Sequence, residues 1–153
     1  MSKNHPVSEL TDHLGFWLRH VSNHVSHAFA ARLADKDVTV AEWVMMRALY
    51  GKDPTLPSRL ADDMGMTRGA ISKLADRLIA KSLIVRKADR TDGRAQTLAL
   101  TGAGADLVPR LAELADQNDA AFFGHLSDSD RAVMEQILKR VVEQCRLTTL
   151  PLA

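Results

Sequence analysis

The most restrictive feature of this sequence is a pair of short helical patterns separated by a single glycine. The first covers 58–64, Gly65 follows it, and Thr67 precedes a second pattern that continues to about Lys81. Glycine commonly ends a helix and threonine commonly caps the next one. Inward-facing positions of the second pattern recur at helical spacing: Ile71, Leu74, Ala75, Leu78 and Ile79. A helix, a tight turn containing glycine and a second helix together predict a helix-turn-helix.

A β-hairpin is predicted directly after this pair. The apolar run 83–85 and the alternating run 97–101 have strand character, and the polar segment between them contains the turn signal Asp92-Gly93. A helix-turn-helix followed by a two-stranded hairpin with a basic tip is a winged helix. Its second helix fits the major groove of duplex DNA, which makes DNA the expected partner.

Long helical patterns flank this region on both sides. The first runs from about Val7 to Asp35 with Ser8 as a plausible N-cap, and it is too long for a small chain to cover by itself. Shorter patterns are expected over 40–50, capped by Thr39, over 102–124, and over 128–147, capped by Ser127. The expected fold class is mainly α with a small β-hairpin wing, and the uncovered first helix favours a second copy as partner. We predict an N-terminal dimerisation helix over 1–35, a winged helix-turn-helix domain over 36–101, and C-terminal dimerisation helices over 102–153.

Charge is unevenly distributed along the 153 residues. The formal net charge is +1, yet the window 68–94 holds eight basic and three acidic residues, a net of +5, so the rest of the chain carries −4. Such an asymmetry is typical of a nucleic-acid contact, although a solvated charged face would give the same count. The sequence has one cysteine, no signal-peptide pattern and no apolar run near the ~20 residues that span a bilayer, which leads us to expect a cytoplasmic protein.

Candidate DNA contacts lie on the outward face of the second helix and on the hairpin. Arg68 is in the first turn, where base edges or phosphates are in reach, and Gly69 lets a backbone approach closely. Lys73 and Arg77 are better placed for phosphates, while Arg90 and Arg94 can enter the adjacent minor groove. The full predicted DNA-binding set is Arg68, Gly69, Ser72, Lys73, Arg77, Lys87, Arg90 and Arg94.

Several segments resemble the MarR family of winged-helix transcriptional regulators. They are Glu42-Trp43-Val44-Met45-Met46-Arg47-Ala48-Leu49, Leu60-Ala61-Asp62-Asp63-Met64-Gly65, Ala70-Ile71-Ser72-Lys73-Leu74-Ala75-Asp76-Arg77-Leu78, Asp92-Gly93-Arg94-Ala95 and Leu98-Ala99-Leu100-Thr101-Gly102-Ala103-Gly104. The chain departs from the family at Ser82, where glycine is usual, and at Gly93, where a second basic residue is common. The resemblance implies a homodimer on a pseudo-palindromic operator, usually a repressor that a small aromatic or anionic ligand releases from DNA.

The effector site is less clearly marked than the DNA contacts. Aromatic and cationic residues of the first two helices could border a cavity for such a ligand, although both tryptophans could equally be core: Trp17, His20, His24, Trp43 and Arg47. His20, His24 and His27 also share one helical side, but with no acidic residue on it we predict no metal site.

Other function classes find less support in the sequence. Cys145 beside Arg146 leaves a redox switch as a minor alternative to a structural thiol. No hydrolase or metalloprotease spacing occurs, so we expect neither an enzyme nor a cofactor. The main alternative is a winged-helix module that binds an acidic protein with the same basic face.

Overall fold

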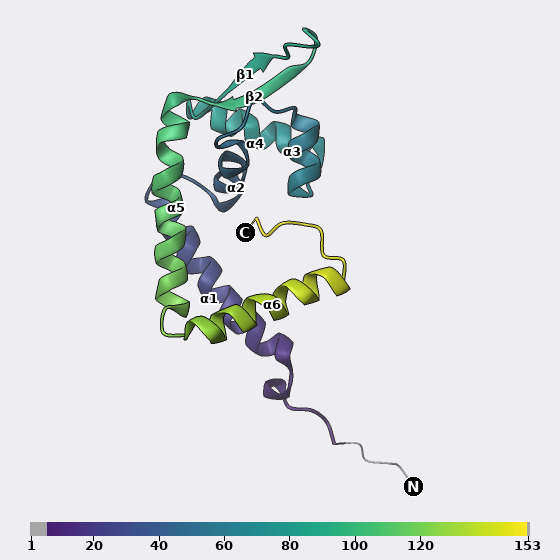
Figure 1. Ribbon diagram of the computed structural model, residues 1–153, viewed down its shortest axis with the longest axis vertical. Coiled ribbons are helices and arrows are strands. Elements are labelled where there is room, and N and C mark those ends of the chain that lie inside the picture. The colour runs from purple at the N-terminus through teal and green to yellow at the C-terminus, as the bar shows by residue number, and fades with distance from the viewer. Residues whose placement is uncertain (1–5, 153) are drawn as a thin grey trace.

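The computed structural model describes residues 6–152, and helices dominate it (Figure 1). The elements in chain order are a 3₁₀ turn (Leu10–Asp12), α1 (Leu14–Ala34), α2 (Val40–Leu49), α3 (Pro57–Met64), α4 (Arg68–Ala80), β1 (Ile84–Ala88), β2 (Gln96–Leu100), α5 (Gly102–Phe123) and α6 (Asp128–Gln144). Helices α2 to α4 and the hairpin form a winged helix at one end of the molecule. Helix α5 leads from it to the other long helices (Figure 1).

Local signals define the helix-turn-helix as the sequence predicted. Gly65 ends α3 in the left-handed conformation with φ of 63°, which glycine adopts without strain. Thr67 Oγ1 then accepts a hydrogen bond from Ala70 N at 3.1 Å and caps α4. Thr39 caps α2 in the same way through Glu42 N at 3.2 Å. These caps satisfy backbone donors that the first helical turns leave free, and so fix where α2 and α4 begin.

The wing is an antiparallel hairpin whose register pairs Ile84 with Leu100 and Ala88 with Gln96. β1 therefore extends beyond the predicted end at Val85. The connector before α3 joins the sheet through Thr55, whose N and O atoms bond to Leu98 at 2.9 and 2.8 Å. This added bridge ties the hairpin to the helix-turn-helix and holds the wing beside α4.

Most of the hydrophobic core lies within the winged helix. Its completely covered side chains include Met45, Met46, Leu60, Ile71, Leu78, Ile84 and Leu98, with Val108 and Leu111 from α5 and Leu33 from α1. At Gly104, a Cβ would lie 2.2 Å from the carbonyl oxygen of Leu83, so only glycine lets α5 approach the start of the hairpin so closely. This packing places the first turns of α5 directly behind the wing.

The first helix begins later than predicted. A helix from Val7 capped by Ser8 is wrong, because a 3₁₀ turn covers Leu10–Asp12 and α1 starts at Leu14. Glu9 N donates to Asp12 Oδ2 at 2.8 Å, which closes the short turn. The apolar side chains of this region contact little, so burial does not favour continuing the helix towards Val7: Val7, Leu10, Leu14, Trp17, Leu18 and Val21 are all exposed.

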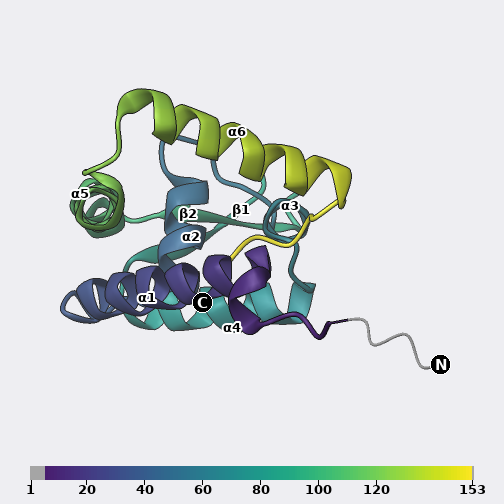
Figure 2. The ribbon, with the colours of Figure 1, turned by 90° about the horizontal axis from the view of Figure 1, so that it is seen from below.

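Helix α6 crosses α1 in Figure 1 but lies apart from it in the view from below (Figure 2). Ser127 caps it, as predicted, through Asp130 N at 3.1 Å. None of its residues is buried, and its apolar stripe faces solvent: Val133, Ile137, Leu138, Val141 and Val142. The chain then runs back to the winged helix, where Leu152 packs against the core. Within residues 6–152, no helix is both long and apolar enough to cross a bilayer.

Candidate nucleic-acid interface and adjoining cavity

Helix α4 divides cleanly into a buried and an exposed face. Ile71, Leu74 and Leu78 fill the core, while the predicted contact residues of this helix all lie on the opposite, exposed side: Arg68, Gly69, Ser72, Lys73 and Arg77. The space above Gly69 is open, since a Cβ placed there would meet no other atom within 4 Å. The helix therefore presents an unobstructed polar surface beside the wing.

Most cations of this surface have no acidic partner. Among residues 6–152, ion-pair contacts with a carboxylate are absent for Arg68, Lys73, Lys87, Arg90 and Arg94. All five are exposed. Because no carboxylate among the described residues pairs with them, their charge is available to an external anion.

The acidic residues in the same segment interact within the protein. Asp76 of α4 pairs with Arg86 of β1 at 2.6 Å. At the wing tip, Asp89 Oδ1 accepts from Thr91 N at 3.2 Å, and Asp92 Oδ1 accepts from Arg94 N at 3.0 Å. Side-chain bonds of aspartate to the backbone two residues later are typical of tight turns. These carboxylates thus bind groups within the subunit and shape the wing.

Arg77 differs from the other predicted contacts. Its Nη2 donates to Glu42 Oε1 at 2.8 Å and to Thr39 Oγ1 at 3.1 Å, so part of the guanidinium faces α2. Glu42 is 1% exposed, and Lys81 Nζ lies 2.9 Å from its other oxygen. Burial alone would raise the pKa of Glu42, but the contacts with Lys81 and Arg77 outweigh it and hold that pKa below its usual value.

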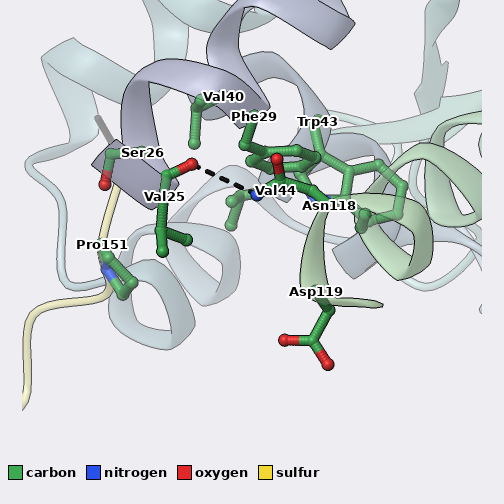
Figure 3. Close-up of a pocket in the computed structure, with 10 residues that line it drawn as sticks. Val25, Ser26, Phe29, Val40, Trp43, Val44, Asn118, Asp119 and Pro151 are labelled. Carbon is green, nitrogen blue, oxygen red and sulfur yellow. Dashed lines mark hydrogen bonds between the residues drawn. The ribbon is translucent and has the colours of Figure 1, made fainter. Parts of the chain in front are cut away.

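A cavity of about 330 Å³ lies between α1, α2 and α5, and the C-terminal segment contributes to its wall (Figure 3). It is lined by Val25, Ser26, Phe29, Val40, Trp43, Val44, Ala115, Asn118, Asp119 and Pro151. The wall contains aromatic and aliphatic side chains but no lysine, arginine or histidine. Its one carboxylate, Asp119, is paired with Arg131 of α6. The chemistry of this lining suits a neutral ring better than an anion.

Asn118 is the most unusual group in the cavity wall. It is 4% exposed, and its Nδ2 donates to the backbone oxygen of Val25 at 3.2 Å (Figure 3). Since that backbone oxygen can only accept, the amide orientation is fixed and Oδ1 must point elsewhere. Oδ1 is buried and has no hydrogen-bond donor among the described residues. A buried acceptor without a donor costs about 1 to 3 kcal/mol, which a donor group would recover.

The five residues predicted to border an effector site do not come together around this cavity. Trp43 lines it, but Trp17, His20, His24 and Arg47 do not. Each of these four residues has other contacts. Trp17 Nε1 donates to Thr11 O at 3.0 Å, and Arg47 lies over the Tyr50 ring. The His20 and His24 rings make an edge-to-face contact with 5.2 Å between their centroids.

Phe29 and Asn118 line the cavity but were not predicted from the sequence. A signal for Asn118 was present, because it continues the inward stripe of Val108, Leu111 and Ala115 as a polar residue.

Metal and thiol chemistry have little geometric support in this subunit. Within residues 6–152, no group of three or more His, Cys, Asp or Glu side chains is placed to hold a metal ion. Cys145 is a free, exposed thiol at the end of α6. Cys145 is not among the residues that line the cavity.

An exposed recognition helix beside a basic wing defines a winged helix-turn-helix DNA-binding protein. Residues 36–95 match the model of the MarR family. A Thauera aromatica protein assigned to regulation of the hcr operon is 30% identical over 86% of this chain and 80% of its own length. The chain belongs to the MarR family of DNA-binding transcriptional regulators.

Solved structures share the fold. S. aureus MepR, in complex with DNA, matches with 22% identity and a TM-score of 0.76 over 86% of this chain and 98% of that one. Bordetella bronchiseptica BpsR, whose DNA binding is regulated by 6-hydroxynicotinic acid, matches with 21% identity and a TM-score of 0.76, over 89% and 97%. The mainly helical architecture with a two-stranded wing is therefore that of known regulators.

Proposed function

We propose that this chain is a homodimeric repressor that binds a pseudo-palindromic operator and leaves it when a small aromatic effector binds. The observation that carries the proposal is the exposed, unpaired set of cations on α4 and the wing, beside acids that interact internally. DNA contacts are assigned to Arg68, Gly69, Ser72, Lys73, Lys87, Arg90 and Arg94, whereas the guanidinium of Arg77 binds Glu42. The protein would act in the cytoplasm by binding DNA, without catalysis.

A second copy of the chain is the proposed occupant of the exposed apolar faces. The stripe on α6 and the apolar residues near the start of α1 leave a large hydrophobic surface uncovered in one subunit. Two-fold dimers matched to two-fold DNA sites are the general solution for helix-turn-helix regulators. Residues 1–35 and 102–153 of the two subunits would then form the dimer interface. Residues 36–101 of each subunit would bind one half-site of the operator.

The proposed effector site is the cavity between α1, α2 and α5. Its volume and its Phe29 and Trp43 walls suit one aromatic ring, and the free Oδ1 of Asn118 calls for a hydrogen-bond donor. A neutral phenol or aromatic amide meets both conditions, whereas a carboxylate would find no counter-charge in the lining. The regulation of BpsR by 6-hydroxynicotinic acid supports an effector-responsive role for the shared fold.

Selection from a random duplex library tests the DNA-binding function. The purified full-length chain should enrich an inverted repeat, and the logarithm of its affinity should fall linearly with the logarithm of salt concentration. A scrambled duplex of equal length is the control. Equal affinity for the selected and scrambled duplexes would instead favour a protein-binding module.

Trp43 fluorescence tests the effector class. In a Trp17→Phe variant, Trp43 is the one remaining tryptophan and it lines the cavity. Titration with phenol should change its emission, while benzoate, of similar size but negatively charged, should have little effect. A response to benzoate that equals or exceeds the response to phenol would contradict the assignment of a neutral ligand.

A further inference from the structure

Glu42, Arg77 of α4 and Lys81, which directly follows α4, form the most enclosed charged cluster among the described residues. Glu42 is 1% exposed, with Arg77 Nη2 at 2.8 Å and Lys81 Nζ at 2.9 Å. Lys81 Nζ also donates to the backbone oxygen of Asp37 at 2.6 Å, just before α2. The cluster thus joins α2 and the segment before it to the C-terminal half of α4.

Such a cluster permits little freedom in the position of α4. A buried carboxylate that loses a cationic partner becomes less favourable, so the structure favours the position of α4 that keeps both cations in reach. The proposed base-contacting end of α4 lies at Arg68, about 13 Å along the helix from Arg77. A tilt of about 10° at the cluster would move that end by about 2 Å, which is enough to break a hydrogen bond to a base.

We propose that Glu42 is a positioning residue for DNA recognition, which sets the angle of α4 by binding Arg77 and Lys81. In this account Arg77 acts chiefly through Glu42 and does not serve as a phosphate ligand. The proposal rests on the proposed function, since it takes α4 as the helix that contacts bases. It predicts that removing the Glu42 charge lowers sequence discrimination rather than general affinity for DNA.

Glu42→Gln tests this, with Asp63→Asn as the matched control. Asp63 pairs with Arg59 at 4.0 Å on the exposed side of α3, so both variants remove one negative charge from the same winged helix. Affinities for the selected and the scrambled duplex are measured over a range of salt, and circular dichroism confirms folding. We expect the ratio of the two affinities to fall about tenfold in Glu42→Gln and to stay within about twofold in Asp63→Asn. A folded Glu42→Gln protein with the wild-type ratio would overturn the proposal.

Arg77→Gln keeps the proposal testable if Glu42→Gln does not fold. If Arg77 acts by positioning, the affinity ratio falls while the salt slope stays close to wild type. If Arg77 is a phosphate ligand, both affinities fall equally and the slope decreases by about 1, which overturns the proposal. If the wild-type chain selects no preferred duplex, the proposed function itself is contradicted, and this inference fails with it.

Discussion

Apolar residues are buried in the winged helix but exposed along much of the terminal helices α1 and α6. In the winged helix, the inward residues of α2, α3 and α4 form one core, with covered side chains such as Met46, Leu60 and Leu78. In α6, an equally regular stripe is exposed along its length, from Val133 to Val142. The same helical periodicity therefore has two consequences. The apolar residues of the winged helix pack against one another within the subunit, whereas the stripe on α6 is suited to packing against a second molecule.

The largest expected effect comes from placing a charge in the exposed stripe of α6. Ile137→Glu costs little in a single subunit, because Ile137 is already exposed there. In a dimer interface it would bury an unpaired carboxylate, at a cost of about 3 to 5 kcal/mol. Analytical ultracentrifugation should then show the mass of one chain.

Gln136→Glu is the matched control, because it adds the same charge on the face of α6 opposite the stripe. It should remain a dimer. If Ile137→Glu also sediments as a dimer, the stripe does not form the interface.

A truncation in the winged helix should act within the subunit instead. Leu78→Ala removes a completely buried side chain and should destabilise the fold by about 3 kcal/mol. Thermal unfolding measures the change, and Val85→Ala, at an exposed position of β1, should have a much smaller effect. Equal loss of stability in both variants would show that the core is not where this structure places it.

Acid should weaken the winged helix through Glu42. Because its pKa is lowered in the folded state, its stabilising contribution is present above the unfolded-state pKa and is lost as pH falls through the folded-state value. The free energy of unfolding, measured from neutral pH to about pH 3, should fall more steeply for wild type than for Glu42→Gln. Parallel pH profiles for the two proteins would contradict the ion-pair assignment.

The smallest predicted effect is a gain in stability at the turn after α4. Ser82 has φ of 60°, a left-handed conformation that is strained for a residue with a Cβ. Ser82→Gly should stabilise the protein by about 0.5 to 1 kcal/mol, and chemical denaturation measures the difference. The backbone oxygen of Ser82, which accepts from Thr101 Oγ1 at 2.7 Å, is retained in the variant. A loss of stability would show that the hydroxyl has a role beyond the turn.

Local signals were enough to predict the helix-turn-helix. Gly65 and Thr67 act on neighbouring backbone groups, so their effect is visible in the sequence alone. The start of α1 was mispredicted because its apolar periodicity continues to Val7, whereas the apolar side chains of that segment are exposed.

Contacts between residues far apart in the sequence could not be predicted from such local signals. The ion pair of Glu42 with Arg77 joins residues 35 positions apart, and the Asn118 bond to Val25 joins residues 93 apart. The packing of α1, α2 and α5 creates the cavity, and no single segment encodes it.

The most direct test of the DNA-binding surface is the affinity of a triple variant for the selected duplex. Arg68→Ala, Lys73→Ala and Arg94→Ala together remove three cations with no acidic partner among residues 6–152, while the apolar stripes on α1 and α6 stay intact. We predict a dimer of unchanged mass that binds at least about 100-fold more weakly, with a salt slope reduced by about 3. A folded triple variant with wild-type affinity and slope would contradict the account.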